Sequence, residues 1–264
     1  MTGPRILIVG GYGTFGGRIV ELLETDPHLK LIVAGRSRTK AATFCDTRKA
    51  ARAALEPAAF DRDGDLAPQL ASLAPALVVD ASGPFQSYGA RAYALVEACI
   101  AAAIPYLDLA DGSEFVAGIK AYDEAAKAAG IAVLSGVSSF PVLTSAVVRE
   151  LGAGLARIDM IEAGIAPSPF AGVGLNVIRA IASYAGRPVR LRRDGKDVAG
   201  YPFTSHRRAT VAPPGRLPLH STLFSLVDVP DLRALPELYP GVQSVWMGAG
   251  PVPAILHRLL IFAA

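Results

Sequence analysis

Arg5-Ile6-Leu7-Ile8-Val9-Gly10-Gly11-Tyr12-Gly13-Thr14-Phe15-Gly16-Gly17 is the most informative stretch of this 264-residue chain. Its first part is a short continuous apolar run, as a strand that is buried on both faces requires. The glycines then give the spacing G-x-G-x-x-G at Gly11, Gly13 and Gly16. A helical pattern begins directly after them and predicts one buried face made of Phe15, Ile19, Leu22 and Leu23. Strand, glycine turn and helix in this order are typical of a dinucleotide-binding fold.

Each glycine of the motif has a physical role in binding a pyrophosphate. Gly11 permits a tight turn, Gly13 lets the phosphates approach the backbone, and Gly16 lets the helix pack close to the strand. The free N–H groups at the helix N-terminus attract phosphate as well. We therefore expect this loop to bind a dinucleotide through Gly10, Gly11, Tyr12, Gly13, Thr14, Phe15 and Gly16. The alternative is a glycine-rich turn that binds no nucleotide.

The residues after the second apolar run indicate which dinucleotide is bound. A site for NAD usually places an acidic residue about 20 positions beyond the glycines, on the ribose 2′-hydroxyl. Arg36 occupies that position here, and Ser37, Arg38 and Lys40 follow it. Guanidinium and ammonium groups suit the extra 2′-phosphate of NADP. The pattern therefore predicts NADP as the cofactor, and the alternative is a solvated basic start of a helix.

Further strands alternate with helices as far as about residue 150. Strands are expected after the first at 31–34, 54–60, 76–81, 105–110 and 131–134, and helices at 39–53, 92–103, 115–129 and 141–151. Asp111 and Glu114 have the spacing of a capping box for the third of these helices. Such alternation gives right-handed crossovers and a parallel sheet. The predicted fold class is therefore α/β, a Rossmann-type doubly wound parallel sheet, in a domain that covers 1–150.

The remainder, 151–264, has a different composition. Of the 20 prolines, 13 lie from Pro141 onward, which favours strands, turns and loops over further βαβ units. We expect a strand at 157–166, a helix at 173–185, and a hairpin that turns at Asp194-Gly195. The chain stops in an uncapped apolar helical pattern at 254–264. This part is therefore predicted to be a smaller α+β domain for substrate binding and dimerisation, incomplete at its C-terminus or packed on a partner.

Composition excludes several classes of protein. The chain is 52% hydrophobic and 19% charged, which allows a sizeable core, and no apolar run is long enough to span a membrane. A net charge of +3 is too small to indicate nucleic-acid binding. Cys45 and Cys99 are expected to be reduced thiols of a cytoplasmic protein. The four histidines, His28, His206, His220 and His257, lack the spacing of metal ligands.

Three further groups are candidates for chemistry. Ligands of open α/β sheets bind at the carboxyl ends of the strands, where Ala81, Ser82, Gly83 and Pro84 follow the fourth strand. Tyr106 and Asp108 are candidates for an acid or base, although core packing or a structural hydrogen bond would also explain them. A basic run in the second part forms a solvated hairpin face, or it meets an anionic substrate or lipid headgroups. It comprises Arg187, Arg190, Arg192, Arg193 and Lys196.

Taken together, these segments resemble the saccharopine dehydrogenase family, especially its bacterial saccharopine dehydrogenase-like members. The resembling stretches cover about residues 5–150 and are Ile8-Val9-Gly10-Gly11-Tyr12-Gly13-Thr14-Phe15-Gly16, Ala34-Gly35-Arg36-Ser37, Val79-Asp80-Ala81-Ser82-Gly83-Pro84-Phe85, Tyr106-Leu107-Asp108-Leu109 and Ser135-Gly136-Val137-Ser138-Ser139-Phe140-Pro141. The resemblance implies an NADP-binding Rossmann domain and an α+β domain that shapes the substrate site and often mediates dimerisation. The activities known in this family include saccharopine reduction, carboxynorspermidine formation and, in related branches, the reduction of lipid-linked enoyl groups.

The sequence thus predicts an NADP-dependent oxidoreductase that exchanges a hydride with a small molecule and forms a homo-oligomer, most simply a dimer. Two alternatives remain open at this point. One is a membrane-associated enoyl reductase of the same fold, which the apolar C-terminal segment suggests. The other is a non-catalytic NADP-binding sensor or scaffold, because no acid or base stands out in the sequence.

Overall fold

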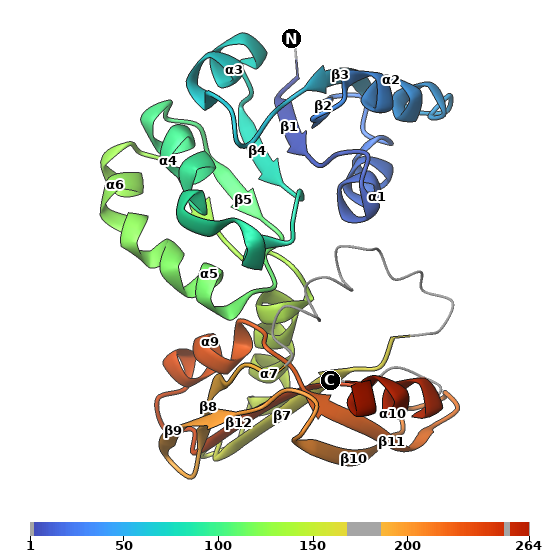
Figure 1. Cartoon of the computed structure of the whole chain (residues 1–264), viewed down its shortest axis with the longest axis vertical. Helices are drawn as coiled ribbons and strands as arrows, with labels where there is room; N and C mark the ends of the chain where they lie inside the picture. Colours follow the sequence, from blue (N-terminus) through green and yellow to red (C-terminus); the bar gives the residue numbers. More distant parts are fainter. Residues whose placement is uncertain (1–2, 168–185, 251–253, 264) are drawn as a thin grey trace. The chain divides into compact units, whose positions relative to one another are not determined.

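A computed structural model describes residues 3–167, 186–250 and 254–263. The chain forms two compact units, coloured along the sequence in Figure 1. The first unit comprises Met1–Ala110 and Gly118–Val137, and the second comprises Asp111–Ala117 and Ser138–Ala264. Among the described residues, no helix has both the length and the apolar character needed to cross a bilayer.

The first unit is built on a parallel sheet of six strands in the order β3-β2-β1-β4-β5-β6. Its strands and helices alternate in the sequence β1 (Arg5–Val9), α1 (Thr14–Leu23), β2 (Lys30–Gly35), α2 (Arg38–Asp46), β3 (Ala54–Ala59), α3 (Leu66–Leu73), β4 (Leu77–Asp80), α4 (Ala94–Ala101), β5 (Tyr106–Asp108), α6 (Asp123–Ala128) and β6 (Val133–Leu134). Successive strands are added to one side of β1 as far as β3, and to its other side from β4 to β6. This strand order is that of the doubly wound dinucleotide-binding fold. The predicted fold class is therefore confirmed.

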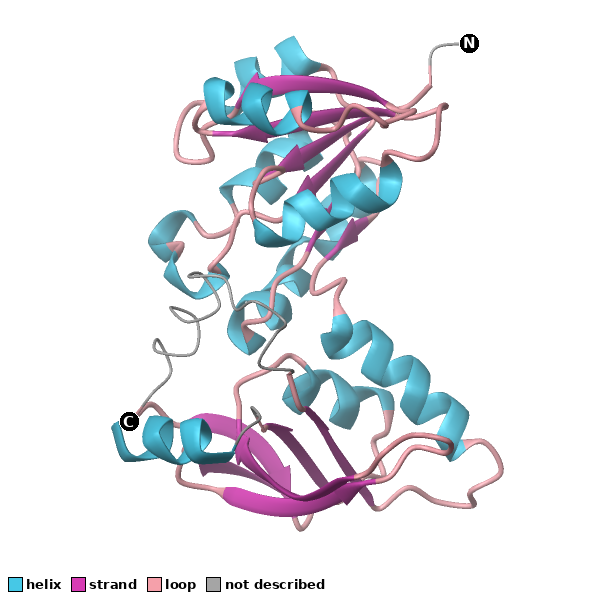
Figure 2. Ribbon diagram, turned by 90° about the vertical axis from the view of Figure 1, so that its right-hand side faces the viewer, coloured by secondary structure: helices cyan, strands magenta, loops and turns pink. Residues whose placement is uncertain are grey.

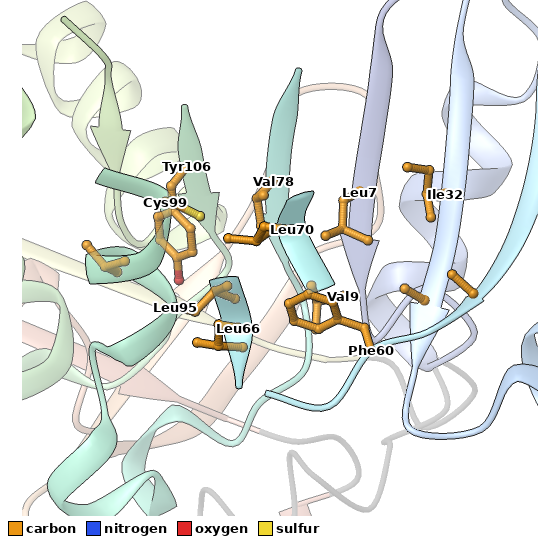
Figure 3. Packing of buried hydrophobic residues seen from close by; sticks show 13 residues of the cluster. Leu7, Val9, Ile32, Phe60, Leu66, Leu70, Val78, Leu95, Cys99 and Tyr106 are labelled. Carbon is orange, nitrogen blue, oxygen red and sulfur yellow. The ribbon is translucent and has the colours of Figure 1, made fainter. Parts of the chain in front are cut away.

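Both faces of this sheet are covered by helices, which explains the continuous apolar runs (Figure 2). Successive residues of β1 contribute to different clusters, since Leu7 and Val9 belong to one and Ile8 to the other. Figure 3 shows the first cluster, in which Phe60, Leu70 and Val78 pack near Leu7 and Val9. Cys99 lies in the same cluster, and its burial raises the pKa of the thiol to about 12.

The face by which α1 packs is only partly the predicted one. Ile19 and Leu23 pack against the core as expected, but Phe15 and Leu22 are 53% and 77% exposed. Gly16, Gly17 and Val20 are the buried residues of the helix. A β-carbon on Gly17 would lie 3.3 Å from the ring of Phe44 on α2. The helix therefore approaches its neighbours through its glycines, and a β-carbon at Gly17 would require the Phe44 ring to shift.

Two helices of the first unit differ from expectation in length. α2 ends at Asp46 rather than near residue 53, and Arg48 then pairs with Glu24 at 2.7 Å. The helix expected at 115–129 is divided into α5 (Ser113–Gly118), a 3₁₀ turn at Ile119–Tyr122, and α6. α5 begins at Ser113, two residues after Asp111, and has Glu114 in its first turn.

The second unit has a mixed sheet in the order β10-β11-β12-β7 and a separate two-stranded sheet, β8-β9. Its elements, besides most of α5, are α7 (Thr144–Gly152), β7 (Met160–Ile165), β8 (Val189–Arg193), β9 (Lys196–Gly200), β10 (His206–Val211), β11 (Leu219–Leu226), α9 (Asp231–Leu238), β12 (Ser244–Ala249) and α10 (Ala254–Ala263). In both views the drawn helices α7, α9 and α10 lie on one face of the four-stranded sheet (Figures 1 and 2). The expected α+β class of this unit is confirmed.

The hairpin at Asp194-Gly195 turns as expected. Asp194 and Gly195 have φ values of +50° and +75°, which is the left-handed backbone of a type I′ turn. Arg190 and Asp197 pair across the two strands and are both exposed, so Arg190 lies on a solvated face of the hairpin. The helix expected at 173–185 lies outside the described residues.

The chain passes from one unit to the other earlier than the expected boundary at residue 150. Residues 138–150 belong to the second unit, and so does the excursion Asp111–Ala117. Within that unit the hydroxyl of Ser113 donates to Asp228, and Glu114 pairs with Arg233 on α9. These two contacts attach the start of α5 to the second unit.

Candidate cofactor site

The glycine loop that follows β1 is shaped by close backbone contacts. Gly10 has a φ of +78°, and the N–H of Gly13 donates to its carbonyl oxygen at 2.8 Å. The N–H of Gly11 donates to the carbonyl of Ala34 on β2 at 2.9 Å. A β-carbon on Gly16 would lie 2.2 Å from the Gly10 oxygen, so any other residue there would force the backbone to shift. The loop therefore needs glycine at these positions for steric reasons.

Gly13 differs from Gly16 because its surroundings are open. It is exposed and caps α1 without a side-chain hydrogen bond, and a β-carbon there would meet only the Gly10 oxygen, at 3.1 Å. Thr14 and Phe15 in the first turn of α1 are exposed as well. The start of this helix thus presents backbone N–H groups to an incoming anion.

Tyr12 joins the glycine loop to the basic residues after β2. Its hydroxyl accepts a hydrogen bond from the backbone N–H of Ser37 at 3.1 Å. The Ser37 side chain in turn caps α2 by accepting from the N–H of Lys40. Arg36, Arg38 and Lys40 are exposed. These three cationic side chains therefore lie beside the glycine loop, and none of them forms an ion pair with a buried group among the described residues.

The segment after β4 touches the glycine loop from the other side. A β-carbon on Gly10 would lie 2.8 Å from the Ala81 carbonyl oxygen and 2.9 Å from the Ser82 Cα. Gly83 and Pro84 continue this segment into a 3₁₀ turn that begins at Phe85. Because β1 and β4 are the strands at which the sheet order reverses, this contact lies at the topological switch point. The structure thus brings the three groups of predicted cofactor-binding residues together.

Sequence reasoning missed a buried network beside Ser82. Asp80, the last residue of β4, is fully buried and accepts from the Ser82 hydroxyl at 2.5 Å and from the Nε of Arg62 at 3.1 Å. The guanidinium of Arg62 lies 3.4 Å from the ring centroid of Tyr88, whose hydroxyl is 2.8 Å from the Ser82 Oγ. An acid that ends an otherwise apolar strand was the one signal for it in the sequence.

Asp108, at the end of β5, is a structural acceptor. Its Oδ1 accepts from the N–H groups of Ala110 and Gly136 and from the hydroxyl of Ser135, at 2.8–2.9 Å. Its Oδ2 is buried and has no hydrogen-bond partner among the described residues. Burial raises the pKa of this carboxyl to about 6, against the three hydrogen bonds, which lower it. Asp108 therefore ties the loop after β6 to β5.

Tyr106 lies in the core on the same side of β5 as Asp108. Its ring belongs to the cluster in Figure 3, and the residue is 1% exposed. Burial, with the neighbouring carboxylates of Asp80 and Asp108, raises the pKa of its hydroxyl well above the usual value. Neither Tyr106 nor the fully buried Asp108 meets solvent, so the first unit supports the packing interpretation of this pair.

The match to known families agrees with this geometry. Residues 6–134 match the family model described as the saccharopine dehydrogenase NADP binding domain. This segment is a saccharopine dehydrogenase NADP-binding domain. The cofactor of this domain is NADP. The match ends at β6, so it includes the glycine loop, Arg36 and the Ser82 segment but not the second unit after residue 137.

Solved structures resemble the chain beyond this NADP-binding domain, at low identity. GenD2 from gentamicin A biosynthesis, in complex with NAD, is 17% identical with a TM-score of 0.46, over 95% of this chain and 66% of its own. Biliverdin reductase from Synechocystis sp. PCC 6803, with biliverdin and NADP⁺, is 16% identical with a TM-score of 0.41, over 94% and 72%. The chain thus spans about two thirds of the first structure's length. No curated protein matches it.

Proposed function

We propose that the chain is an NADP-dependent oxidoreductase of the saccharopine dehydrogenase-like family, which transfers hydride between NADP and a small molecule. The observation that carries the proposal is the meeting of Gly10, Ser82 and the Tyr12–Ser37 link at the switch point of the sheet. Cofactor contacts are assigned to Gly10–Gly16, to Arg36, Ser37, Arg38 and Lys40, and to Ala81–Pro84. The hydride chemistry belongs to the cofactor, and the chain supplies binding, orientation and electrostatics.

Each group of residues has a part in this proposal. The N–H groups at the start of α1 would bind the pyrophosphate, because they carry partial positive charge and have no partner within the helix. Arg36 and its neighbours would bind the 2′-phosphate by charge-assisted hydrogen bonds. The segment Ser82–Pro84 would contact the half of the cofactor that carries the nicotinamide, since it follows the first strand of the second half of the sheet.

A non-catalytic NADP sensor is the second candidate, and one observation favours it. Tyr106 and Asp108, the acid and base candidates of the NADP-binding domain, are 1% and 0% exposed. A proton donor must come within hydrogen-bond reach of the substrate, directly or through one water. A sensor would need the cofactor contacts alone.

Titration of the whole chain with NADPH and NADH, followed by a screen for NADPH oxidation, separates these possibilities. We expect NADPH to bind more tightly than NADH. We also expect at least one carbonyl, imine or enoyl compound to oxidise NADPH in the presence of the chain. Absence of NADPH binding would refute the proposal. Tight NADPH binding without turnover of any compound class would favour the sensor.

A further inference from the structure

The buried network at the end of β4 is a closed ring of four side chains from three segments. Arg62 lies in the connection between β3 and α3, Asp80 and Ser82 lie at the end of β4, and Tyr88 lies in the turn that follows. Arg62 is 9% exposed, and one of its terminal nitrogens donates to the carbonyl of Ala92 at 2.6 Å. Its guanidinium is therefore held by a carboxylate, a backbone carbonyl and an aromatic face at the same time.

The hydrogen bonds of this ring have a defined direction. The carboxylate of Asp80 can only accept, so the Ser82 hydroxyl donates to it. The Oγ of Ser82 then accepts from the hydroxyl of Tyr88 at 2.8 Å. The ring of Tyr88 stacks on Arg62, which donates to the second oxygen of Asp80. Each member of the network thus orients the next one.

The ring determines where the backbone of Ser82 lies. Asp80 accepts from the Ser82 N–H as well as from its hydroxyl, at 3.0 and 2.5 Å. That backbone is in contact with Gly10, because a β-carbon placed on Gly10 would lie only 2.9 Å from the Ser82 Cα. Arg62 comes from the half of the fold that contains β1 to β3, whereas Ser82 begins the other half. The network therefore joins the two halves at the line across which a dinucleotide binds.

We propose that Arg62 and Tyr88 are positioning residues for the nicotinamide half of NADP. They hold Ser82–Pro84 against the glycine loop in the orientation that this half of the cofactor requires, and they act through Ser82 rather than on the cofactor itself. The inference rests on the proposed function, because it assumes that NADP lies across the switch point. The adenine half, with its 2′-phosphate, lies on the side of β2 and Arg36 and does not depend on the network.

The test compares two ligands on the full-length chain. NADPH contains both halves, and 2′-phospho-ADP contains only the adenine half with its phosphates. Tyr88→Phe removes the hydroxyl and keeps the ring over Arg62; Arg62→Lys keeps the charge but loses the planar, multidentate guanidinium. Calorimetric titration should show NADPH weakened about threefold to tenfold by Tyr88→Phe, the size of one neutral hydrogen bond, and by about tenfold or more by Arg62→Lys. Affinity for 2′-phospho-ADP should change less than about twofold.

Two residues of the same unit provide matched controls. Tyr122 donates its hydroxyl to Glu97 at 2.7 Å, away from β4, so Tyr122→Phe should change neither affinity. Arg91 donates to the carbonyl of Asp63 at 2.7 Å, in the same connection as Arg62, but it is exposed. Arg91→Lys should therefore leave both affinities unchanged.

Equal loss of affinity for both ligands would overturn the inference, since it would show a general structural role. Unchanged NADPH affinity in Tyr88→Phe would overturn it as well. If Arg62→Lys does not fold, judged by its thermal unfolding, Tyr88→Phe decides the question. Failure of the wild-type chain to bind either ligand would instead refute the proposed function, and this inference with it.

Discussion

Arg36 stands where an NAD enzyme would carry its acid, exposed at the end of β2 and beside the Tyr12–Ser37 link. The 2′-phosphate distinguishes NADPH from NADH, so a preference must arise from contacts to it. A hydrogen bond to a charged group contributes about 1.5–3 kcal/mol, or roughly ten- to a hundredfold in affinity. Calorimetric titration of Arg36→Ala should show NADPH weakened by that factor and NADH nearly unchanged.

Arg36→Asp should reverse the preference, because a carboxylate repels the phosphate and accepts a hydrogen bond from the ribose hydroxyl. Arg52 is a matched control, as it is exposed just before β3, at the opposite end of the strands. Arg52→Ala should leave both affinities as they are. Equal weakening of NADPH and NADH in Arg36→Ala would show that Arg36 does not bind the 2′-phosphate.

Asp108 illustrates how a buried carboxyl makes stability depend on pH. Burial raises its pKa from 3.8 to about 6, so the folded state binds the proton more tightly than the unfolded state does. The stabilisation that comes with this proton is complete below pH 3.8 and is lost as the pH rises through about 6. The loss corresponds to roughly 3 kcal/mol. Asp108→Asn keeps the Oδ1 acceptor without the charge, so it should raise the free energy of unfolding at pH 8 and flatten its slope between pH 4 and 6.

Urea unfolding at several pH values measures this effect. Asp123→Asn on the exposed start of α6 is the control and should leave the slope nearly unchanged, since the pair of Asp123 with Lys127 is exposed to solvent and such pairs contribute little to stability. Asp108→Ala should destabilise the chain at every pH, because three donors lose their acceptor. A loss of stability at pH 8 in Asp108→Asn as large as that in Asp108→Ala would contradict this account.

At the scale of the element, α1 depends on two glycines for different reasons. Alanine inside a helix is normally more stable than glycine by about 0.5–1 kcal/mol. A β-carbon on Gly16 would lie 2.2 Å from the backbone oxygen of Gly10, and this clash outweighs the gain. Thermal and urea unfolding of Gly16→Ala should therefore show a loss of about 2–3 kcal/mol.

Gly13 serves the ligand rather than the fold. Its β-carbon would meet a single atom at 3.1 Å, so Gly13→Val should unfold close to the wild-type temperature. The same side chain would occupy the space of the pyrophosphate, and NADPH binding should be abolished in a fluorescence titration. A folded Gly13→Val that binds NADPH with wild-type affinity would disprove the assignment of the glycine loop.

The docking of α10 depends on a histidine that the sequence did not single out. His257 is 1% exposed; its Nδ1 lies 3.0 Å from the carbonyl oxygen of Leu223, and its Nε2 lies 2.8 Å from the Ser225 hydroxyl. A carbonyl only accepts, so Nδ1 donates and Nε2 is the acceptor of a neutral ring. Burial, and then the charge of His206, lowers the pKa of this imidazole below 6.5.

A lowered histidine pKa gives stability that is present above the ordinary pKa of 6.5 and is lost as the pH falls below it. Acidification should therefore loosen α10 from β11, with faster hydrogen exchange of its amides at pH 5.5 than at pH 7.5, after correction for intrinsic rates. His257→Phe should exchange fast at both pH values, because the hydrogen bonds of the imidazole to Leu223 and Ser225 on β11 are then lost. The exposed His220 is the control, and His220→Phe should behave as the wild type.

At the scale of the whole molecule, the four-stranded sheet of the second unit has α7, α9 and α10 on one face (Figures 1 and 2). On β7 the residues that alternate with the core residue Ile161 include Met160, which is 59% exposed. Exposed apolar surface of this kind usually marks a contact. We therefore predict that the chain self-associates through this unit, and that light scattering at micromolar concentration shows a dimer which Met160→Lys weakens.

Leu22→Lys is the control for this prediction. Leu22 on α1 is exposed and apolar too, but it belongs to the first unit, so its substitution should leave the dimer intact. A monomeric wild-type chain at micromolar concentration would contradict the prediction.

The sequence by itself determined the parallel sheet, the glycine loop and the choice of NADP. These features depend on local patterns: continuous apolar runs, glycine spacing and the residue at a set distance along the chain. They could be predicted because neighbours in sequence carry the whole signal. The sequence did not determine the boundaries of α2 and α5, because Arg48, just after α2, and Ser113, at the start of α5, bind partners that are distant in the chain.

Only the tertiary structure decided how α1 packs, where the units divide, and which side chains hold the Ser82 segment. Ser113 and Asp228 are 115 residues apart, Arg62 and Asp80 are 18 apart, and nothing in their local patterns indicates that they meet. Their pairing follows from the burial of polar groups, which must find partners wherever the fold brings them. Long-range contacts of this kind exist only once the strands have been ordered in space, so the network around Asp80 appears in the structure and not in the sequence.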